Sequence, residues 1–465
     1  MSKKTDVRVI GVEVYFLSAP MRVPLKFGGE TIESCSVARV KMQISDGNGR
    51  TGYGWGESVL SPGWAWPATS TFAERDEFMK DFCLKLAAAW SNFEVSGHPL
   101  EIGNDFTTSK LDTILAEANE GQKIPMPHLA ALNCAAAFDM ALHDAYGVFH
   151  DVPIYETYNA KWMNRDLSCF LEASAPHIDF RGKYPADFMV EQAPKQLPVW
   201  HLVGGRDLIA ESERTGTEPE DGYPVVLDEW ITEDGLKCLK IKLRGNDAAW
   251  DFQRMVDVGR IAIERGVNWL SPDFNCLVTD PQYVNDILDR LVLEHPMIYG
   301  KILYVEQPFP YDLESNQIDV HSVSSRKPLF MDESCHDWQF IRMGYNLGWN
   351  GVALKTCKTQ SGALLSMCWA KAHGMTLMVQ DLTNPMLSII PHILLAAHSG
   401  TIMGVECNAS QFYPETSLPE SKIHPGIYKR SNGVVDFSTL SGSGFGYNGA
   451  EHARKLSTPA FSKLK

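Results

Sequence analysis

The sequence lacks paired cysteines, a long apolar run and an excess of positive charge. Its ten cysteines are scattered singly, with no C-x-x-C pair and no Cys/His cluster of zinc-finger spacing. No apolar run reaches the roughly 18–20 residues that a membrane span needs. The first twenty residues alternate like a strand and do not resemble a signal peptide. We therefore expect reduced thiols, a cytoplasmic location and no membrane partner.

The charge balance argues against a nucleic-acid partner. The 465 residues carry a formal net charge of -15, whereas nucleic-acid binding favours a basic surface. The length allows two or more domains with a substantial core. The stretch GYGWGE (52–57) superficially resembles a phosphate-binding glycine loop, but it follows a turn and opens no helix, so we do not expect nucleotide binding.

Two kinds of pattern divide the chain. The alternating runs at 7–16 and 36–45 predict antiparallel strands, and the apolar periodicity of 127–146 predicts a helix. From about residue 198, short apolar runs alternate with helix-length stretches, in the order PVWHLV, CLKIKL, NWLSPD, ILYVE, PLFMD, GVALK, TLMVQD and TIMGVE. Eight such strands predict an α/β fold with a (β/α)8 TIM-type barrel. An open doubly wound sheet is the alternative, although no glycine-rich turn follows its first strand.

The stretch CLKIKLRG (238–245) contains two lysines in an otherwise apolar strand. Lys240 and Lys242 share one face of the strand because side chains alternate along it. Taken alone, such a run is more often a half-buried strand with a solvated basic face. The alternative is that the lysine face lines an active site inside the barrel.

Charged residues at the ends of later strands favour the second interpretation. Asp273, Glu306 and Asp332 each follow an apolar run directly, on three successive strands. Catalytic groups of such barrels lie at the carboxyl ends of the strands, although any one acidic residue there could be a helix N-cap. Three carboxylates in one low-dielectric site would repel one another unless a cation neutralised them, and an all-oxygen ligand set suits Mg²⁺.

The lysines then take opposite sides of this site. Lys242 ends the second strand and Lys355 ends the sixth, so in a closed ring of eight they face each other. A lysine that acts as a base near neutral pH needs a lowered pKa. Lys240 and a metal ion would both supply the positive charge that lowers it. We therefore expect the lysine face to point into the barrel.

These motifs together resemble the enolase superfamily. They are Lys-x-Lys, Asp-x-Asn (Asp273, Asn275), Glu-Gln-Pro from Glu306, Asp-Glu-Ser from Asp332, and the strand-end Lys355. The pattern is most similar to the muconate lactonizing enzyme subgroup of the mandelate racemase/muconate lactonizing enzyme group. The resemblance implies an N-terminal α+β capping domain at 1–155, a barrel at 197–408, and a C-terminal segment, 409–465, that returns to the capping domain. The segment 156–196 has no counterpart in the family.

The resemblance also implies roles for the strand-end residues. Asp273, Glu306 and Asp332 would bind Mg²⁺ (or Mn²⁺), and the metal would hold the carboxylate of a small-molecule substrate. Lys242 and Lys355 would be the acid/base pair on opposite faces of the α-carbon, with Lys240 close to the substrate carboxylate. Weaker candidates for substrate binding are Asn275, Asp381 and Glu406, of which the last two could equally cap the following segment.

Two opposed bases would permit racemisation or epimerisation through an enediolate, which is the function we expect. A syn-dehydratase or a cycloisomerase could use the same site. A non-catalytic barrel that only binds a carboxylate is a further alternative, but it would have no use for two opposed bases. A homo-oligomer is expected because closed symmetric assemblies are common among such enzymes.

Some stretches depart from the family pattern. TCKTQSG (356–362) lacks the paired glycines that often follow the sixth strand, and Lys358 within it is expected at a helix start or on the surface. The loop 206–224 is either a lid or disordered. In MRVPLKFGGETIES (21–34), Arg22 and Lys26 suggest an anionic substrate only weakly, since a solvated loop is the commoner interpretation. Gly28 and Gly29 in the same loop could form a hinge.

Overall fold

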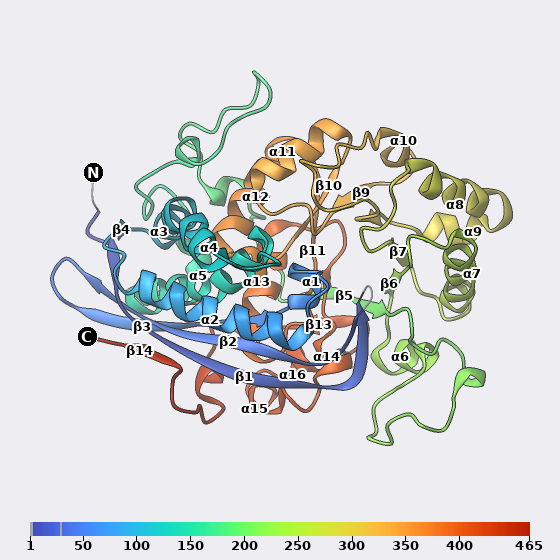
Figure 1. The fold of residues 1–465 in the computed structure, drawn as a ribbon, viewed down its shortest axis with the longest axis horizontal. Helices are drawn as coiled ribbons and strands as arrows, with labels where there is room; N and C mark the ends of the chain where they lie inside the picture. The colour runs from blue at the N-terminus through green and yellow to red at the C-terminus, as the bar shows by residue number, and fades with distance from the viewer. Residues whose placement is uncertain (1–2, 28–29) are drawn as a thin grey trace.

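The computed structural model describes residues 3–27 and 30–465, which form an antiparallel sheet with helices and, beside it, a parallel barrel (Figure 1). The Gly28–Gly29 hinge predicted from the sequence, and the side chain of Lys26, lie outside what is described. The antiparallel sheet has the order β14-β1-β2-β3, with β4 also paired to β1. Its strands are β1 (Val7–Phe27), β2 (Glu30–Asp46), β3 (Thr51–Leu60), β4 (Ser96–Gly97) and β14 (Phe461–Lys463).

Helices cover one face of this sheet. They are α1 (Pro62–Ala65), α2 (Phe72–Trp90), α3 (Pro99–Phe106), the π-helical turn η1 (Thr107–Leu111), α4 (Asp112–Asn119) and α5 (His128–His150). We call residues 7–150 the capping region. The glycines of GYGWGE lie in β3 because α5 crosses this strand closely: a Cβ on Gly54 or Gly56 would lie 2.1–2.2 Å from backbone atoms of α5. The glycines therefore permit helix packing, and the stretch is a strand rather than a phosphate loop.

The parallel strands predicted from the sequence are all present and adjacent in chain order. Within the described residues the parallel sheet has the order β11-β10-β9-β8-β7-β6-β5-β12. The strands are β5 (Gln196–Val203), β6 (Cys238–Lys242), β7 (Trp269–Asp273), β8 (Val305–Glu306), β9 (Leu329–Met331), β10 (Gly351–Leu354), β11 (Thr376–Val379) and β12 (Val405–Glu406). Between the two end strands, the backbone N–H of Ile402 donates to the carbonyl of Leu377 at 2.8 Å. The sheet thus curls into the predicted (β/α)8 TIM-type barrel.

Helices on the outside of the barrel connect its strands. They are α6 (Leu227–Asp234), α7 (Ala248–Glu264), α8 (Pro281–Glu294), α9 (Pro296–Lys301), α10 (His321–Ser324), α11 (Trp338–Leu347), α12 (Gln360–Ala372) and α13 (Ile389–Ser399). Several begin at an acidic N-cap: the side chains of Asp247, Asp280 and Asp337 accept hydrogen bonds from backbone N–H groups of the first turn. These aspartates therefore have a structural role.

Large side chains fill the barrel below its carboxyl end. Trp200, Cys238, Tyr304, Phe330 and Met378 form a separate buried cluster. The rings of Trp200 and Tyr304 lie 5.4 Å apart, and those of Tyr304 and Phe330 lie 4.5 Å apart. The cluster closes the lower part of the barrel, so a substrate can enter only from the capping side.

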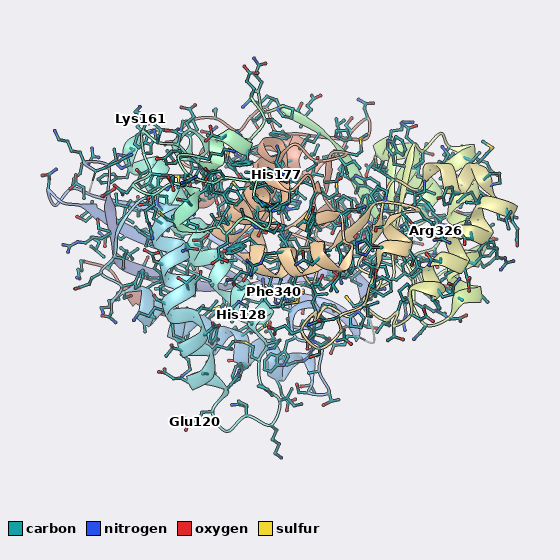
Figure 2. All side chains as sticks on the ribbon, turned by 90° about the horizontal axis from the view of Figure 1, so that it is seen from above. Glu120, His128, Lys161, His177, Arg326 and Phe340 are labelled. Carbon is teal, nitrogen blue, oxygen red and sulfur yellow. The ribbon has the colours of Figure 1, made fainter. Side chains whose placement is uncertain are left out.

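The segment 156–196 packs on the outside of the barrel. It contains the short turns η3 (Leu167–Cys169) and η4 (Pro185–Phe188), and η2 (Ile154–Thr157) overlaps its start. The indole N–H of Trp369 on α12 donates to the carbonyl of Glu172 at 2.9 Å. Figure 2 shows Lys161 of this segment toward one end of the molecule and Arg326 of the barrel toward the other. The segment is thus part of the folded structure, against α12.

The C-terminal residues contact both parts of the chain. They contain α14 (Ala409–Phe412), α15 (Leu418–Ser421), α16 (Pro425–Tyr428), β13 (Val434–Asp436) and the turn η8 (Ala450–His452). β13 pairs antiparallel with β5, and β14 pairs antiparallel with β1. Among the described residues, no helix is both long enough and apolar enough to cross a membrane.

The loop 206–224 lies against the β1–β2 arm, where Arg22 holds it. The Arg22 guanidinium pairs with the Asp221 carboxylate at 2.5 Å and donates to the carbonyls of Tyr223 and Pro224. Its side chain is only 6% exposed. The expectation of a solvated Arg22 is therefore wrong, and its charge serves an internal ion pair.

Candidate active site

The face of β6 that carries the two lysines points into the barrel. Lys240 is 3% exposed and Lys242 is 8% exposed. The Nζ of Lys240 lies 2.6 Å from Glu306 Oε1, 3.3 Å from Asp273 Oδ2 and 3.3 Å from Glu406 Oε2. One lysine therefore joins acidic residues from three other strand ends. The interpretation of this strand as half-buried with a solvated basic face is therefore wrong.

Lys242 lies one layer higher, at the end of β6. Its Nζ pairs with the Asp273 carboxylate and donates to Asn275 Oδ1 at 3.2 Å. Asn275 also donates its backbone N–H to Asp273 Oδ1 at 2.9 Å. Its φ of 56° lies in the left-handed region, which asparagine tolerates better than most residues. The Asp-x-Asn motif thus orients Asp273 through a local turn.

Lys355 reaches the same space from β10, four strands from β6 in the sheet order. Its Nζ lies 3.0 Å from Asp332 Oδ2 and donates to the carbonyl of Asp381 at 2.9 Å. Lys242 and Lys355 both line one cavity at the carboxyl end of the barrel. The structure therefore brings the two lysines to one site from opposite strands.

Lys358 lies just before the start of α12, which is one of the two places expected from the sequence, but it is not at the surface. It is 3% exposed, and its Nζ lies 3.5 Å from Asp332 Oδ1 and donates to the Asp332 carbonyl. The reason is the 3-10 turn η6 (Thr356–Lys358), which follows β10 directly and returns Lys358 to the side of Lys355. Asp332 thus has one lysine against each carboxylate oxygen.

Burial and neighbouring charges shift the pKa values of these groups in opposite directions. Burial opposes ionisation of Asp273, but the ammonium groups of Lys242 and Lys240 lower its pKa overall. Burial and the charge of Asp273 raise the pKa of Glu306 well above its ordinary value. Burial acts against the charge of Lys355, but Asp332 raises its pKa. The carboxylates therefore depend on nearby cations to remain ionised together.

The donor set fits a divalent metal in its chemistry. Glu306 Oε1 and Asp332 Oδ1 are buried and have no hydrogen-bond donor, only lysine ion pairs. Across residues 3–27 and 30–465, no three His, Cys, Asp or Glu side chains are gathered as a finished metal site. The reason is visible in the contacts, since the carboxylate oxygens turn to lysine Nζ atoms. Buried oxygen ligands in need of positive charge suit Mg²⁺.

Asp381 and Glu406 are bonded within the protein. Asp381 Oδ1 accepts from the Asn384 backbone N–H at 2.9 Å, and its Oδ2 accepts from the Asn408 N–H at 2.6 Å. Glu406 Oε1 accepts from Asn408 Nδ2 at 2.6 Å, and its Oε2 accepts from the Asp381 N–H at 3.2 Å. Of the two roles that the sequence leaves open, capping matches the contact of Asp381 with the Asn384 N–H, in the segment that follows β11. Glu406 accepts instead from the Asn408 side chain and from the Asp381 N–H, and both acids line the cavity.

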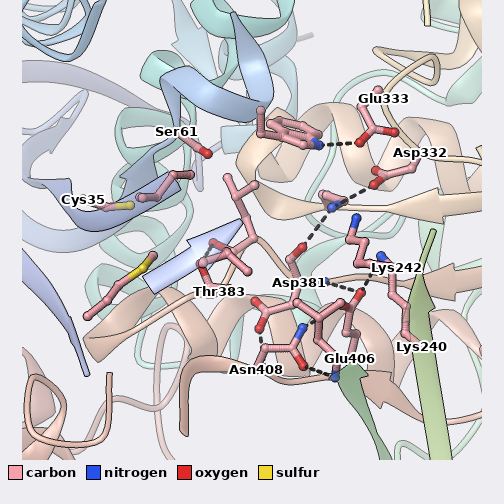
Figure 3. A pocket seen from close by; sticks show the side chains of 17 residues that line it. Cys35, Ser61, Lys240, Lys242, Asp332, Glu333, Asp381, Thr383, Glu406 and Asn408 are labelled. Atoms are coloured by element: carbon pink, nitrogen blue, oxygen red, sulfur yellow. Dashed lines mark hydrogen bonds and ion pairs between the residues drawn. The ribbon is translucent and has the colours of Figure 1, made fainter. Parts of the chain in front are cut away.

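The cavity over these residues is small and lies between the barrel and the capping region. Its volume is about 50 Å³. Figure 3 shows Cys35 and Ser61 on one side of it and Lys242, Asp332 and Glu333 on the other. The indole N–H of Trp64, on α1, donates to Glu333 Oε1 at 2.9 Å. The capping region thus forms the roof of the site and is hydrogen-bonded to the barrel.

Sequence reasoning missed three residues of this site. The position of Lys358 in the site could have been predicted, because it lies three residues after Lys355 in a turn that follows a strand. Gln380, whose amide donates to the Glu306 carboxylate, directly precedes Asp381 at the end of β11 and was not singled out from the sequence. Nothing in the sequence near Trp64 indicates its place in the site, because its partner Glu333 is 269 positions away.

Comparison with known proteins places the fold. No protein-family model and no curated protein matches the sequence. Several solved structures do match over nearly the whole chain. The L-Ala-D/L-Glu epimerase from Bacillus subtilis, in a substrate-liganded complex, is 17% identical over 98% of this chain and 100% of its own, with a TM-score of 0.59.

Two further structures match at the same TM-score of 0.59. The dipeptide epimerase from Enterococcus faecalis V583, complexed with Mg and the dipeptide L-Leu-L-Tyr, is 18% identical over 94% of this chain and 99% of its own. A mandelate racemase/muconate lactonizing protein from Herpetosiphon aurantiacus is 16% identical over 96% and 99%. The resemblance predicted from the motifs is therefore confirmed for the fold: the chain has the barrel and capping architecture of the mandelate racemase/muconate lactonizing enzyme group of the enolase superfamily.

Proposed function

We propose that this protein is a Mg²⁺-dependent racemase or epimerase that removes a proton α to a carboxylate. The observation that carries the proposal is the pair Lys242 and Lys355, which enter one buried cavity from strands on opposite sides of the barrel. Two opposed amines can remove a proton from one face of a carbon and return it to the other. Structures with this fold include epimerases, which supports the same chemistry.

The metal would be held by Asp273, Glu306 and Asp332. Bound Mg²⁺, or Mn²⁺, would hold the substrate carboxylate and neutralise the charge that develops when the α-proton leaves. The dipeptide epimerase from Enterococcus faecalis is complexed with Mg and a dipeptide, which supports this metal. Buried carboxylate oxygens without hydrogen-bond donors supply the ligands on this chain.

The lysines divide the remaining work. In one direction Lys242 is the neutral amine that accepts the α-proton, and Lys355 is the ammonium that donates a proton to the opposite face. The other direction needs a neutral Lys355, whose pKa Asp332 raises in this structure, so a cation bound to Asp332 would have to offset that charge. Lys240 lies below them and adds a positive charge next to the position of the substrate carboxylate. The filled barrel floor and the capping region exclude water from the carbanionic carbon.

The test is exchange of the α-proton with solvent. The protein is incubated in D₂O with Mg²⁺ and a panel of carboxylic acids, and the α-proton signals are followed by NMR. We expect one compound class to lose its α-proton signal and to appear as both stereoisomers. The double variant Lys242→Met/Lys355→Met, folded by circular dichroism, is the control without exchange. Exchange that persists in this variant would contradict the proposal.

A further inference from the structure

The described residues that form the roof of the cavity carry no charge. The capping-region residues that line it are Met21, Leu25, Ile32, Cys35, Ser61 and Trp64. Four are apolar side chains, and Cys35 and Ser61 are small and neutral. Among the described residues of the capping region, no acidic or basic side chain lines this cavity. Arg22, next to Met21 in sequence, instead lines a neighbouring cavity of about 290 Å³ and is paired with Asp221.

The acidic residues on the barrel side are already engaged. Each oxygen of Asp381 and Glu406 accepts a hydrogen bond from within the protein, and Glu406 also contacts Lys240. Glu333 Oε1 accepts from Trp64, and the Cys276 thiol is hydrogen-bonded to the same carboxylate. Among the described residues that line the cavity, a substrate ammonium would therefore find no carboxylate without a protein partner outside the proposed metal ligands. Burying an ammonium without a partner is strongly unfavourable.

Polyhydroxylated acids would also fit poorly. A chain of hydroxyl groups against Leu25, Ile32 and Leu382 would lose its hydrogen bonds to water and gain none. Among the described residues, the neutral polar groups on the cavity are few: Ser61 on the roof, and Thr383 and Asn408 on the barrel side, of which Asn408 already donates to Glu406 and accepts from the Leu202 N–H. They suit one amide or similar neutral polar group, with the rest of the molecule aliphatic.

We propose that the substrate is a small carboxylate whose other substituents are uncharged, with an aliphatic group against the capping region and no free ammonium. An N-acylated aliphatic amino acid has this chemistry, whereas a dipeptide with a free amino end and a sugar acid do not. This inference rests on the proposed function and narrows its substrate. It differs from the dipeptides bound by some proteins of the same fold.

The experiment compares three compounds of nearly equal shape. N-propionyl-L-leucine is the reference. Glycyl-L-leucine replaces its terminal methyl group with an ammonium, and N-propionyl-L-asparagine replaces the aliphatic side chain with an amide of similar size. Binding to the Mg²⁺-loaded full-length protein is measured by calorimetry, and α-proton exchange in D₂O is measured by NMR. Mn²⁺ binding, followed by electron paramagnetic resonance, reports the metal site independently.

We expect N-propionyl-L-leucine to bind about 100-fold more tightly than glycyl-L-leucine, and more tightly than N-propionyl-L-asparagine, because the two polar groups lose their water without replacement. Equal or tighter binding of glycyl-L-leucine would overturn the inference. So would failure of all three to bind a protein that binds Mn²⁺. Tight binding of N-propionyl-L-leucine without exchange would support the substrate class and contradict the proposed reaction, so the two failures are distinct.

A substitution on the roof tests the same inference from the protein side. Met21 is half-buried at the edge of the cavity. Met21→Glu should reduce the preference for N-propionyl-L-leucine over glycyl-L-leucine by about tenfold or more, because it offers the ammonium a carboxylate. Met21→Leu, which keeps the roof apolar, should retain the preference. An unchanged preference in Met21→Glu would show that the roof does not select the substrate.

Discussion

Lys358 lies against Asp332, with its Nζ 3.5 Å from one carboxylate oxygen and bonded to the carbonyl of the same residue. The other oxygen of Asp332 faces Lys355 at 3.0 Å. Asp332 is therefore held from two sides by residues three positions apart. Its position depends on the turn that follows β10 as much as on its own strand.

Removal of the Lys358 ammonium should disturb the site without unfolding the chain. In Lys358→Met we expect kcat to fall by about tenfold or more, because Asp332 loses a contact that fixes its orientation. Steady-state kinetics, once a substrate is found, measures this effect. Lys371→Met is the control, since Lys371 lies on α12 and donates to Ser399, away from the cavity. Equal losses in both variants would contradict a specific role for Lys358.

The two lysines of the proposed acid/base pair should serve opposite faces of the α-carbon. Lys242→Met should abolish solvent exchange of one stereoisomer and spare that of the other, and Lys355→Met should do the reverse. NMR of each pure stereoisomer in D₂O measures both exchanges. If each variant lost both exchanges equally, with fold and metal binding intact, two separate bases would be ruled out.

Metal binding should stabilise the folded chain. At Mg²⁺ about 100 times its Kd, binding to the folded state alone adds about 2.7 kcal/mol to the free energy of unfolding. We expect a rise in the melting temperature that EDTA reverses. Glu306→Gln should weaken the rise, because it removes a buried charged ligand. The same rise in wild type and in Glu306→Gln would place the metal elsewhere.

The hydrogen bond from Trp64 to Glu333 should be measurable as stability. Trp64→Phe keeps an aromatic ring but leaves Glu333 Oε1 without this donor, at a cost of about 1–3 kcal/mol beyond the lost volume. Trp349→Phe is the matched control, because the buried Nε1 of Trp349 has no hydrogen-bond partner. Urea unfolding of the two variants gives the difference. Equal destabilisation would mean that the hydrogen bond contributes nothing.

Stability should fall as the pH rises through the range where Asp144 ionises. Burial raises the pKa of Asp144 from 3.8 to about 7, although the Phe445 and Trp55 N–H groups oppose the shift. The folded state keeps this proton when the unfolded state has lost it. The contribution is therefore fully present below pH 4 and lost by about pH 7, and amounts to roughly 4 kcal/mol.

Asp144→Asn isolates this effect, because asparagine does not titrate. The free energy of unfolding of the wild type should fall relative to that of the variant between pH 4 and pH 7. Denaturant unfolding at several pH values measures the difference, and Asp286→Asn, at the surface of α8, is the control. A difference between wild type and Asp144→Asn that is constant with pH would contradict a raised pKa.

The order of the barrel strands could be predicted because each is a short apolar run bounded by helix-length stretches. The shared orientation of the two lysines of β6 could also be predicted, because the alternation of side chains along a strand depends only on neighbouring positions. Lys358, Trp64 and Arg22 could not be placed in the same way. Each is positioned by a partner on a distant element, namely Asp332, Glu333 and Asp221, and no pattern near these residues indicates that partner.

The roles of Asp381 and Glu406 also depend on distant contacts. Both end a strand just as Asp273 and Glu306 do, and the sequence alone does not distinguish the four. The distinction comes from neighbouring backbone: Asp381 and Glu406 lie across from each other where the two end strands of the sheet meet. Main-chain N–H groups of Asn384, Asn408 and Asp381 donate to these two carboxylates, and Glu406 also contacts Lys240 at 3.3 Å inside the cavity.

The junction of β11 and β12 is where the barrel is least supported by backbone pairing. The strands are the two ends of the ladder, and Ile402 to Leu377 is the backbone bond described between them. The side chains of Asp381 and Glu406 add hydrogen bonds that link the two end strands at this junction. A substitution at either residue would remove hydrogen bonds that link the two end strands, together with a side chain that lines the cavity, so a loss of activity in such a variant would need a measurement of stability beside it.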